Sequence, residues 1–472
     1  MKLESISIKN YRSVETINID LKPINDESYT YGLIGVNEAG KSSILKGIAL
    51  TDNFKSINIT LKDYYIKSNP ILCEYLYSLE DKEIDELLLL TTELIDKKDL
   101  VFENFRKLKL QFSFLPSDFL KPQIFAVFSL AKGNINFALN PGTEVLQFFK
   151  NKTHKTIFWT ADEKHLITNT ISLASFASDP DSISIPLRNC FKLAGITNIQ
   201  ERIDLLDDST ERESLREELG IKVTKHIKRV WPKHPIKITF DISNGNIHFH
   251  VKDDDVIGKS KTADQRSDGF RQFISFLLTL SAENINSELK NTIILLDEPE
   301  THLHPRAQED LLKELIAITK GDNNNIVFFA THSNYMIDKT FLSRNYKITK
   351  PKDKTLIDKF DEKQSSYASV NYDVFEIVST DYHNELFGKA QEISEIQIGT
   401  EFDKKIKEVI ENCPKKNYQH SKGAKFECSL PTYIRHQIHH PENDKNQKFT
   451  ESELEKSIKI LLDFITKLKA VK

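Results

Sequence analysis

Residues 35–42 read Gly-Val-Asn-Glu-Ala-Gly-Lys-Ser and match the pattern G-x-x-x-x-G-K-[ST] at every fixed position. A short apolar run at 31–34 precedes this loop, and residues 42–50 have the character of a helix. A strand, then a glycine-bearing loop, then a helix is the context in which this pattern binds phosphate, whereas a chance glycine turn would lack it. The stretch therefore predicts an α/β fold with a phosphate site at the end of a buried strand.

The fixed residues of this loop have separate physical tasks. The two glycines let the backbone curl so that successive N–H groups face the phosphates. We expect Lys41 to reach the outer phosphates and the Ser42 hydroxyl to ligate Mg²⁺. The helix that follows turns its positive end toward the anion. The predicted phosphate-binding set is Gly35, Asn37, Glu38, Ala39, Gly40, Lys41, Ser42 and Ser43.

Two carboxylates follow a second apolar strand, at residues 292–296. We expect Asp297 to hold Mg²⁺, directly or through water, and Glu298 to orient and polarise an attacking water. A surface acidic turn is the alternative interpretation. The specific continuation PETHLHP at 299–305 argues against it.

A histidine follows a third apolar strand. The segment FFATHS at 328–333 places His332 just past the strand, and such strand ends lie beside the phosphate loop in doubly wound sheets. A lone histidine is usually structural or solvated, and this chain has 14 of them. Its position distinguishes His332 from the others, and we predict that it hydrogen-bonds the γ-phosphate.

The composition excludes several classes of protein. Of 472 residues, 39% are hydrophobic and 28% charged, which is the balance of an ordinary globular protein. A net charge of −4 gives no global positive field, so contact with nucleic acid would need a local patch or a partner. The four cysteines form no CxxC pair and no zinc spacing, which favours the reducing cytoplasm. No run of about 18 apolar residues occurs, so no membrane span is predicted.

Three motifs in this order resemble those of the ABC-type ATPases of the RecF, SMC and OLD (overcoming lysogenisation defect) group. They are GVNEAGKSS at 35–43, RSDGFRQF at 266–273 and LLDEPETHLHP at 295–305. The resemblance implies that the chain binds ATP and Mg²⁺ and hydrolyses ATP. It also implies that Ser267 and Gly269 contact the γ-phosphate of ATP held by another subunit, in an ATP-sandwich homodimer or a higher oligomer. A helix cap at these residues is compatible with that role, because a helix start is an anion site.

The early turn Asn10-Tyr11-Arg12-Ser13 is similar to the N-F-R-S turn of the same group. This similarity implies that Arg12 lies near the nucleotide. The Q-loop glutamine of the group has no clear counterpart, and Gln111 is a poor match for it. The resemblance covers residues 1–95 and 236–350, under half of the chain.

The predicted fold is an α/β ABC ATPase head that combines a doubly wound phosphate-loop sheet with an antiparallel β subdomain. Residues 1–95 form its N-terminal lobe with the phosphate loop. Residues 236–360 form its C-terminal lobe with the signature RSDGFRQF at 266–273, the carboxylates Asp297 and Glu298, and His332. Residues 96–235 are predicted to be an inserted, largely helical arm or dimerisation region. Residues 361–472 are predicted to be a mostly helical C-terminal region.

Three local patterns predict individual elements. Alternating apolar residues at 236–252 predict a hairpin, and the charged segment 211–230 resembles an exposed helix or arm. Thr450 and Glu453 form a capping box at the start of a last helix with one apolar face.

The OLD nucleases carry a C-terminal Toprim domain, which needs a glutamate and a later D-x-D at strand ends to bind metal. No such set is found after residue 340, and Asp253-Asp254-Asp255 is interpreted as a solvated turn after a hairpin. The chain is therefore predicted to be an ATPase that controls a separate effector nuclease, of Toprim or HNH type, in bacterial anti-phage defence. Its size, inserted arm and missing nuclease resemble the ATPase subunit of the PARIS system first, and that of the Septu system next.

Two other functions stay open. A RecF-like repair ATPase would bind duplex DNA in an ATP-dependent and salt-sensitive manner. A self-contained ribonuclease would use Arg435 and His440, whose spacing matches the R-x4-6-H motif of HEPN ribonucleases. The alternative for this segment is a helix terminus, with His439 and His440 at its negative end and Pro441 after it.

Overall fold

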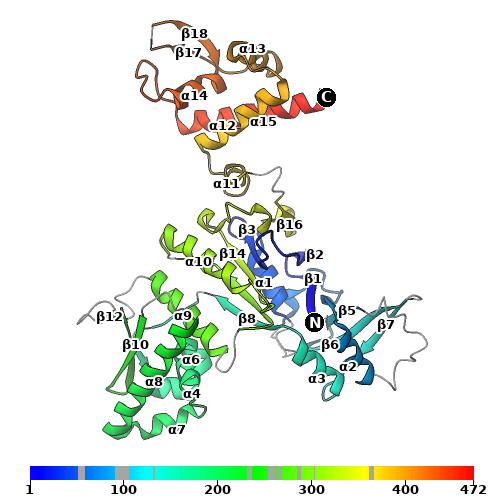
Figure 1. The fold of residues 1–472 in the computed structure, drawn as a ribbon, viewed down its shortest axis with the longest axis vertical. Coiled ribbons are helices and arrows are strands. Elements are labelled where there is room, and N and C mark those ends of the chain that lie inside the picture. Colours follow the sequence, from blue (N-terminus) through cyan, green and yellow to red (C-terminus); the bar gives the residue numbers. More distant parts are fainter. Residues whose placement is uncertain are drawn as a thin grey trace. The chain divides into compact units, whose positions relative to one another are not determined.

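The protein forms two compact units, Met1–Phe360 and Asp361–Lys472. The computed structural model describes residues 1–50, 59–90, 106–130, 133–160, 162–168, 170–230, 236–253, 261–262, 268–283, 289–301, 303–360, 366–421 and 423–471. Figure 1 shows the order of the helices and strands along the chain.

The first unit is built on a six-stranded mixed sheet that carries the predicted phosphate loop (Figure 1). The strand order is β16-β15-β3-β14-β13-β8, and only β15 and β16 pair in antiparallel fashion. In this order the strands are Leu356–Lys359, Asn345–Thr349, Thr30–Ile34, Ile326–Thr331, Thr292–Asp297 and Lys155–Thr160. The helices packed on it are α1 (Lys41–Ala49), α9 (Asp268–Glu283) and α10 (Pro305–Ile318).

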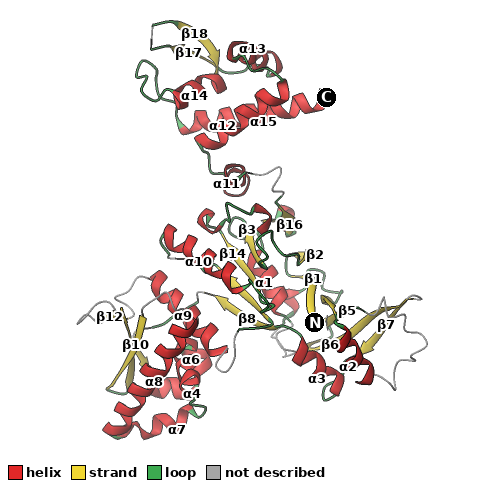
Figure 2. Cartoon of the chain, in the orientation of Figure 1, coloured by secondary structure: helices red, strands yellow, loops and turns green. Residues whose placement is uncertain are grey.

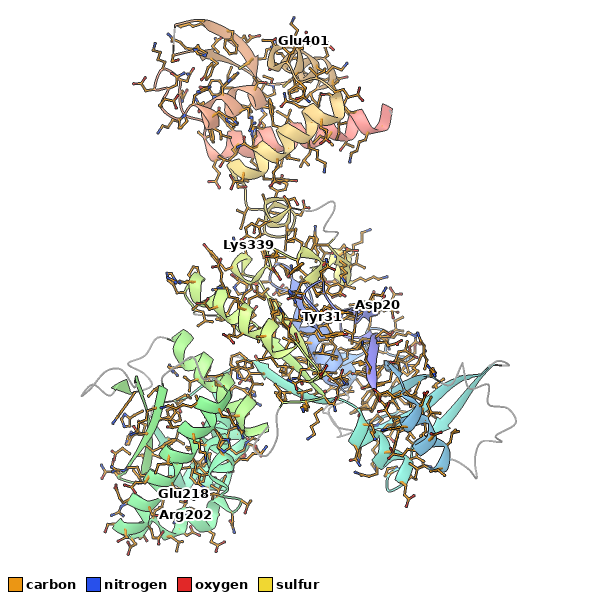
Figure 3. All side chains as sticks on the ribbon, viewed as in Figure 1. Asp20, Tyr31, Arg202, Glu218, Lys339 and Glu401 are labelled. Carbon is orange, nitrogen blue, oxygen red and sulfur yellow. The ribbon has the colours of Figure 1, made fainter. Side chains whose placement is uncertain are left out.

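Alternate residues of the central strands face two different cores. Leu295 and Phe328 belong to a core shared with α1, whereas Leu296 and Phe329 belong to a core shared with α9 and α10. Tyr31 on β3 lies in the first of these cores, among the side chains of the unit's interior (Figure 3). Burial on both faces explains why these strands are continuously apolar in the sequence.

A second six-stranded sheet is antiparallel throughout, in the order β2-β1-β4-β5-β6-β7. Its strands are Val14–Asp20, Lys2–Tyr11, Ile71–Ser78, Lys107–Leu115, Asp118–Leu130 and Gly133–Ala138, and the helices α2 (Asp81–Leu90) and α3 (Glu144–Lys152) accompany it. The register places buried Ile6 between Ile19 and Tyr75. Together with the parallel sheet, this confirms the predicted fold class.

The predicted helical insertion at 96–235 is wrong in its first half. Residues 107–138 form β5, β6 and β7 of the antiparallel sheet, and residues 155–160 form the edge strand β8 of the parallel sheet. The alternating burial of β5 requires a sheet partner, which β4 provides across the predicted boundary at residue 95. The helical part begins at α4 (Leu173–Ser178).

The helical part is a subdomain of its own, with a single core drawn from residues 167–282. Its helices after α4 are α5 (Pro180–Ile183), α6 (Ile185–Ala194), α7 (Ile199–Asp204) and α8 (Ser209–Val230), followed by α9. Its sheet joins β10 (Ile236–Ser243), β11 (Asn246–Asp253), β12 (Lys261–Thr262) and β9 (Thr170–Ser172). The predicted hairpin at 236–252 is confirmed, but residue 235 is no boundary, because this core spans both sides of it.

The helix α8 is not an exposed arm. Leu215, Leu219, Val223 and Ile227 form a fully buried stripe along it, at the spacing of one helix face. Gly220 lies against β10, where an added Cβ would come 3.3 Å from the Ile238 carbonyl oxygen. The charged residues of α8 therefore cover only its outer side.

The second unit consists of helices and one two-stranded hairpin within its described residues (Figure 2). Its elements are α11 (Tyr367–Phe375), α12 (Thr380–Ser394), α13 (Gly399–Val409), β17 (Lys415–Gln419), β18 (Lys425–Ser429), α14 (Leu430–His439) and α15 (Glu451–Val471). They enclose a separate hydrophobic core. The predicted capping box is confirmed, because Thr450 N donates to Glu453 Oε2 at 3.1 Å and Glu453 N to Thr450 Oγ1 at 3.2 Å.

All four cysteines are buried. Cys73 lies in the core of the two large sheets, Cys190 in that of the helical subdomain, and Cys413 and Cys428 in that of the second unit. Burial raises the pKa of each thiol, that of Cys428 to about 12. These thiols are packing groups in the folded protein.

Candidate active site

The predicted phosphate loop joins β3 to α1, and its two glycines are required by their surroundings. A Cβ at Gly35 would lie 2.5 Å from the Ile348 carbonyl oxygen on β15. Gly40 has φ 102°, and a Cβ there would collide with the Thr355 side chain. The loop is therefore held closely by the β15–β16 segment as well as by its own strand and helix.

Lys41 lies at the start of α1 and is 4% exposed. Its Nζ donates hydrogen bonds of 2.9 Å to the carbonyl oxygens of Gly35 and Val36, across the hollow of the loop. Burial lowers the pKa of Lys41, and the nearby carboxylates of Glu298 and Asp297 oppose this shift. A phosphate group in the hollow would add negative charge and hydrogen-bond acceptors beside the buried ammonium.

A polar cavity of about 310 Å³ opens beside the loop, a size within the range of small-molecule sites. Its lining comes from the loop, from the β1–β2 turn, from the end of β13 and from the segment after β15. The lining residues are Ser13, Asn37, Glu38, Gly40, Lys41, Ser42, Ser43, Glu298 and Lys350.

Asp297 ends β13 two strands from the loop, and the sheet order brings it to Ser42. Ser42 Oγ donates to Asp297 Oδ1 at 2.9 Å. Burial raises the pKa of Asp297, and the hydrogen bond from Ser42 opposes that shift. Two adjacent hard oxygen ligands fit Mg²⁺, which is bound by one or two protein oxygens together with substrate phosphates and water. Among the described residues, no group of three or more His, Cys, Asp and Glu side chains could hold a metal by itself.

Glu298 and His332 are brought together at neighbouring strand ends. His332 Nδ1 lies 3.3 Å from Glu298 Oε1, and both side chains are about half exposed, 44% and 40%. Glu298 has φ 52°, and its backbone N–H donates to Ala330 O at 3.0 Å. Positive φ is costly for a non-glycine residue and is concentrated at functional sites.

The family resemblance alone assigned Arg12, Ser267 and Gly269. Arg12 is not among the residues that line the cavity. Arg12 has its Nε 2.9 Å from Asp63 Oδ1, and its neighbour Ser13 lines the cavity instead. Gly269 lies in the first turn of α9, and Ser267 lies outside the described residues. Because Ser267 and Gly269 would act on ATP of another subunit, their role stays a prediction.

Three residues near the site were not found from the sequence. Ser13 and Lys350 line the cavity, and Glu300 is buried beneath His332. The signal for Lys350 was its place just after a strand that follows FFATHS. Glu300 had no such signal, since the sequence does not show which carboxylate of the acidic motif is buried.

Arg435 and His440 have separate partners in the second unit. Arg435 Nη1 donates to Asn384 Oδ1, and the guanidinium lies 5.4 Å from the centre of the Phe387 ring. His440 lies at the end of α14, with Nδ1 3.4 Å from Glu442 Oε1. These contacts give Arg435 a packing role and fit the helix-terminus interpretation.

The fold is that of an ABC-type ATPase head, with a phosphate loop between β3 and α1. The chain belongs to the AAA ATPase domain family AAA_15, whose model matches residues 1–337. No helix among the described residues is long and apolar enough to cross a membrane.

Two curated relatives are similar to this chain. The Old nuclease of Escherichia phage P2 is 24% identical over 408 residues, which are 81% of this chain and 66% of that protein. An uncharacterised protein of Methanocaldococcus jannaschii is 28% identical over 129 residues, 26% of this chain and 33% of that protein. The chain thus spans less than two thirds of the length of the curated relatives it matches.

Among solved structures, an SMC head bound to the C-winged helix domain of ScpA is similar at 11% identity and a TM-score of 0.42. The likeness covers 77% of this chain and 99% of that one. The family assignment does not depend on this likeness.

Proposed function

We propose that the chain binds ATP with Mg²⁺ in the 310 Å³ cavity and hydrolyses the bond between the β- and γ-phosphates of ATP. The observation that supports this most strongly is the convergence of three contacts at one edge of the sheet. Lys41 spans the hollow of the loop, Ser42 meets Asp297, and Glu298 meets His332. The residues proposed for phosphate binding, metal binding and water activation therefore lie next to one another.

Each of these side chains has a defined task in the proposed reaction. The loop N–H groups and Lys41 hold the phosphates, and Ser42 and Asp297 would hold Mg²⁺, which when bound neutralises phosphate charge. Glu298 orients a water for in-line attack and accepts its proton. His332 contacts Glu298, and its proposed task is to donate a hydrogen bond to the γ-phosphate.

The wider role that we propose is ATP-gated control of a separate effector nuclease in bacterial anti-phage defence, in the cytoplasm. An ATP-sandwich homodimer or higher oligomer would use Ser267 and Gly269 of one subunit against ATP of the other. The likeness to the Old nuclease supports a link to nucleic-acid cleavage. Residues 341–472 contain no D-x-D, so these residues do not supply the metal motif of a Toprim nuclease.

The test of the ATPase is a pair of variants with a matched control. Glu298→Gln keeps the size of the side chain but removes the base, so kcat should fall by about 100-fold or more while ATP still binds. Lys41→Ala should abolish ATP binding, measured by calorimetry. Glu309→Gln, an exposed carboxylate on α10 paired with Lys339 at 3.0 Å, should behave as the wild type.

Two results would contradict these assignments. Unchanged turnover in Glu298→Gln would show that Glu298 is not the base. Unchanged ATP affinity in Lys41→Ala would show that nucleotide binds elsewhere than in this cavity.

A further inference from the structure

Glu300 is a carboxylate with almost no access to water. It lies three residues after Asp297, is 1% exposed, and burial raises the pKa of its carboxyl group. Its Oε1 accepts hydrogen bonds from the Thr331 hydroxyl and, at 3.3 Å, from the His332 backbone N–H. Its Oε2 is buried without a hydrogen-bond partner in the described structure. Burying such a group is costly, so its place calls for a reason.

A second side chain connects the same two segments. Gln308 of α10 donates from Nε2 to Leu303 O at 2.9 Å and accepts at Oε1 from Ser333 Oγ at 2.5 Å. Ser333 N in turn donates to Thr331 Oγ1 at 2.9 Å. The turn after Asp297 and the start of α10 are thereby hydrogen-bonded to the loop 331–333.

These contacts determine where the His332 ring lies. The ring Nδ1 is 3.3 Å from Glu298 Oε1 and 4.0 Å from Glu300 Oε1. Thr331 is fully buried at the end of β14, whereas the His332 side chain is 44% exposed. The half-exposed ring is attached to a backbone whose N–H donates directly to Glu300.

We propose that Glu300 is a positioning residue, which holds the Thr331–His332 peptide so that the His332 ring meets Glu298 and the γ-phosphate, with Gln308 as a second support. The inference rests on the proposed function, in which Glu298 and His332 serve ATP hydrolysis. Because Glu300 is almost fully buried, we place its action in its hydrogen bonds to Thr331 and His332.

The test compares Glu300→Leu with Glu300→Gln in the full chain. Leucine removes both hydrogen bonds, so kcat should fall about tenfold or more, the rate equivalent of a lost charge-assisted hydrogen bond. KM for ATP should stay within about twofold, since the phosphate loop is untouched. Glutamine keeps an oxygen at Oε1 and should retain most of the turnover. Glu309→Gln is the control.

A double-mutant cycle distinguishes positioning from a general structural role. If Glu300 acts through His332, Glu300→Leu should cause no further loss of kcat in a His332→Ala background. A full additional loss there would overturn the proposal. A loss in Glu300→Gln as large as that in Glu298→Gln would also overturn it, since the carboxylate itself would then take part in chemistry.

A third measurement separates this proposal from the ATPase assignment. In histidine-labelled protein, the NMR signal of the His332 ring, assigned with His332→Gln, should shift in Glu300→Leu and not in Glu309→Gln. Absence of turnover in the wild type would reject the proposed ATPase function. A shifted His332 signal in Glu300→Leu would still support the positioning role of Glu300. An unshifted signal would reject that positioning role. Thr331→Val, which removes only the hydroxyl donor, replaces Glu300→Leu if that variant does not fold.

Discussion

Lys350 brings a second ammonium group to the cavity that Lys41 faces. It follows β15, which pairs with β3 and so ends beside the phosphate loop. Its nearest carboxylate is that of Asp353, 3.7 Å away and almost fully exposed at 98%. A weak surface pair of this kind leaves the lysine available to a phosphate.

We therefore expect Lys350→Ala to raise KM for ATP roughly tenfold, the equivalent of about 1.4 kcal/mol, with kcat little changed. Steady-state kinetics and calorimetric ATP affinity measure this effect. Lys352→Ala, two residues on and outside the cavity lining, is the control. Equal KM values in both variants would show that Lys350 does not contact the nucleotide.

At the scale of residues, the sequence predicted local structure where a single continuous motif determines it. Residues 35–43 predicted their own loop, and the strand ends at Asp297 and His332 followed from the alternation of strands and helices. Glu300 could not be predicted, because its role depends on which strands become neighbours, and Lys350 had only its place after a strand as a signal. The same applies to Arg12, whose ion pair with Asp63 involves a distant turn.

At the scale of elements, Arg344 joins the segments before β3 and β15. Its side chain is fully buried, with Nε 2.7 Å from Asp338 Oδ2 and Nη2 3.0 Å from Asp26 Oδ2. Nη1 donates to Ser28 Oγ at 2.7 Å and to Thr30 O at 3.1 Å. This cluster fixes how the loop into β3 meets the chain into β15.

Arg344→Ala should lower the free energy of unfolding of the first unit by about 3–5 kcal/mol, because it leaves two carboxylates without their partner. Denaturant unfolding measures this, and Lys320→Ala, which removes an exposed partner of Asp26 at 3.3 Å, should cost less than about 1 kcal/mol. A small loss in Arg344→Ala would show that the cluster adds little net stability.

The effect of Arg344→Ala should also depend on pH. Burial raises the pKa of Asp26, but hydrogen bonds from Ser28 and Arg344 outweigh it and the pKa is lowered. A lowered pKa gives stability that is present above the unfolded value of about 3.9 and is lost as pH falls through the folded value. The difference between wild type and variant should therefore shrink below about pH 4.

Individual elements were easier to predict than their assembly. The hairpin of β10 and β11 follows from period-two alternation in the sequence. The membership of β5, β6 and β7 in the first antiparallel sheet does not, since β5 pairs with a strand about 35 residues earlier. The buried stripe of α8 was hidden by the charged residues between its four apolar positions.

At the scale of the whole molecule, the lining of the 310 Å³ cavity beside the phosphate loop comes from the first unit and ends at Lys350. The second unit has its own core and lies outside the matched family region 1–337. The sequence predicted a change of character near residue 360, and the one motif that it offered there, Arg435 with His440, has separate structural contacts.

We expect the tagged chain, isolated from its native host in ATP and Mg²⁺, to carry a nuclease at fixed stoichiometry. If ATP gates the association, Lys41→Ala should lose the nuclease and Glu298→Gln should keep it. Mass spectrometry and mass photometry measure identity and ratio. Recovery of the chain without a nuclease, in both wild type and Glu298→Gln, would contradict control of a separate effector.

The buried cysteines can report the opening of the three cores that contain them. A thiol reagent can reach Cys73, Cys190 or Cys428 only when the surrounding core opens, so the rate of modification reports that opening. Peptide mass then shows which of the three cores opened, in one sample and without any substitution. Adding ATP should slow the modification of Cys73. A change in the modification rates of Cys413 and Cys428 would show that ATP also alters the stability of the second unit.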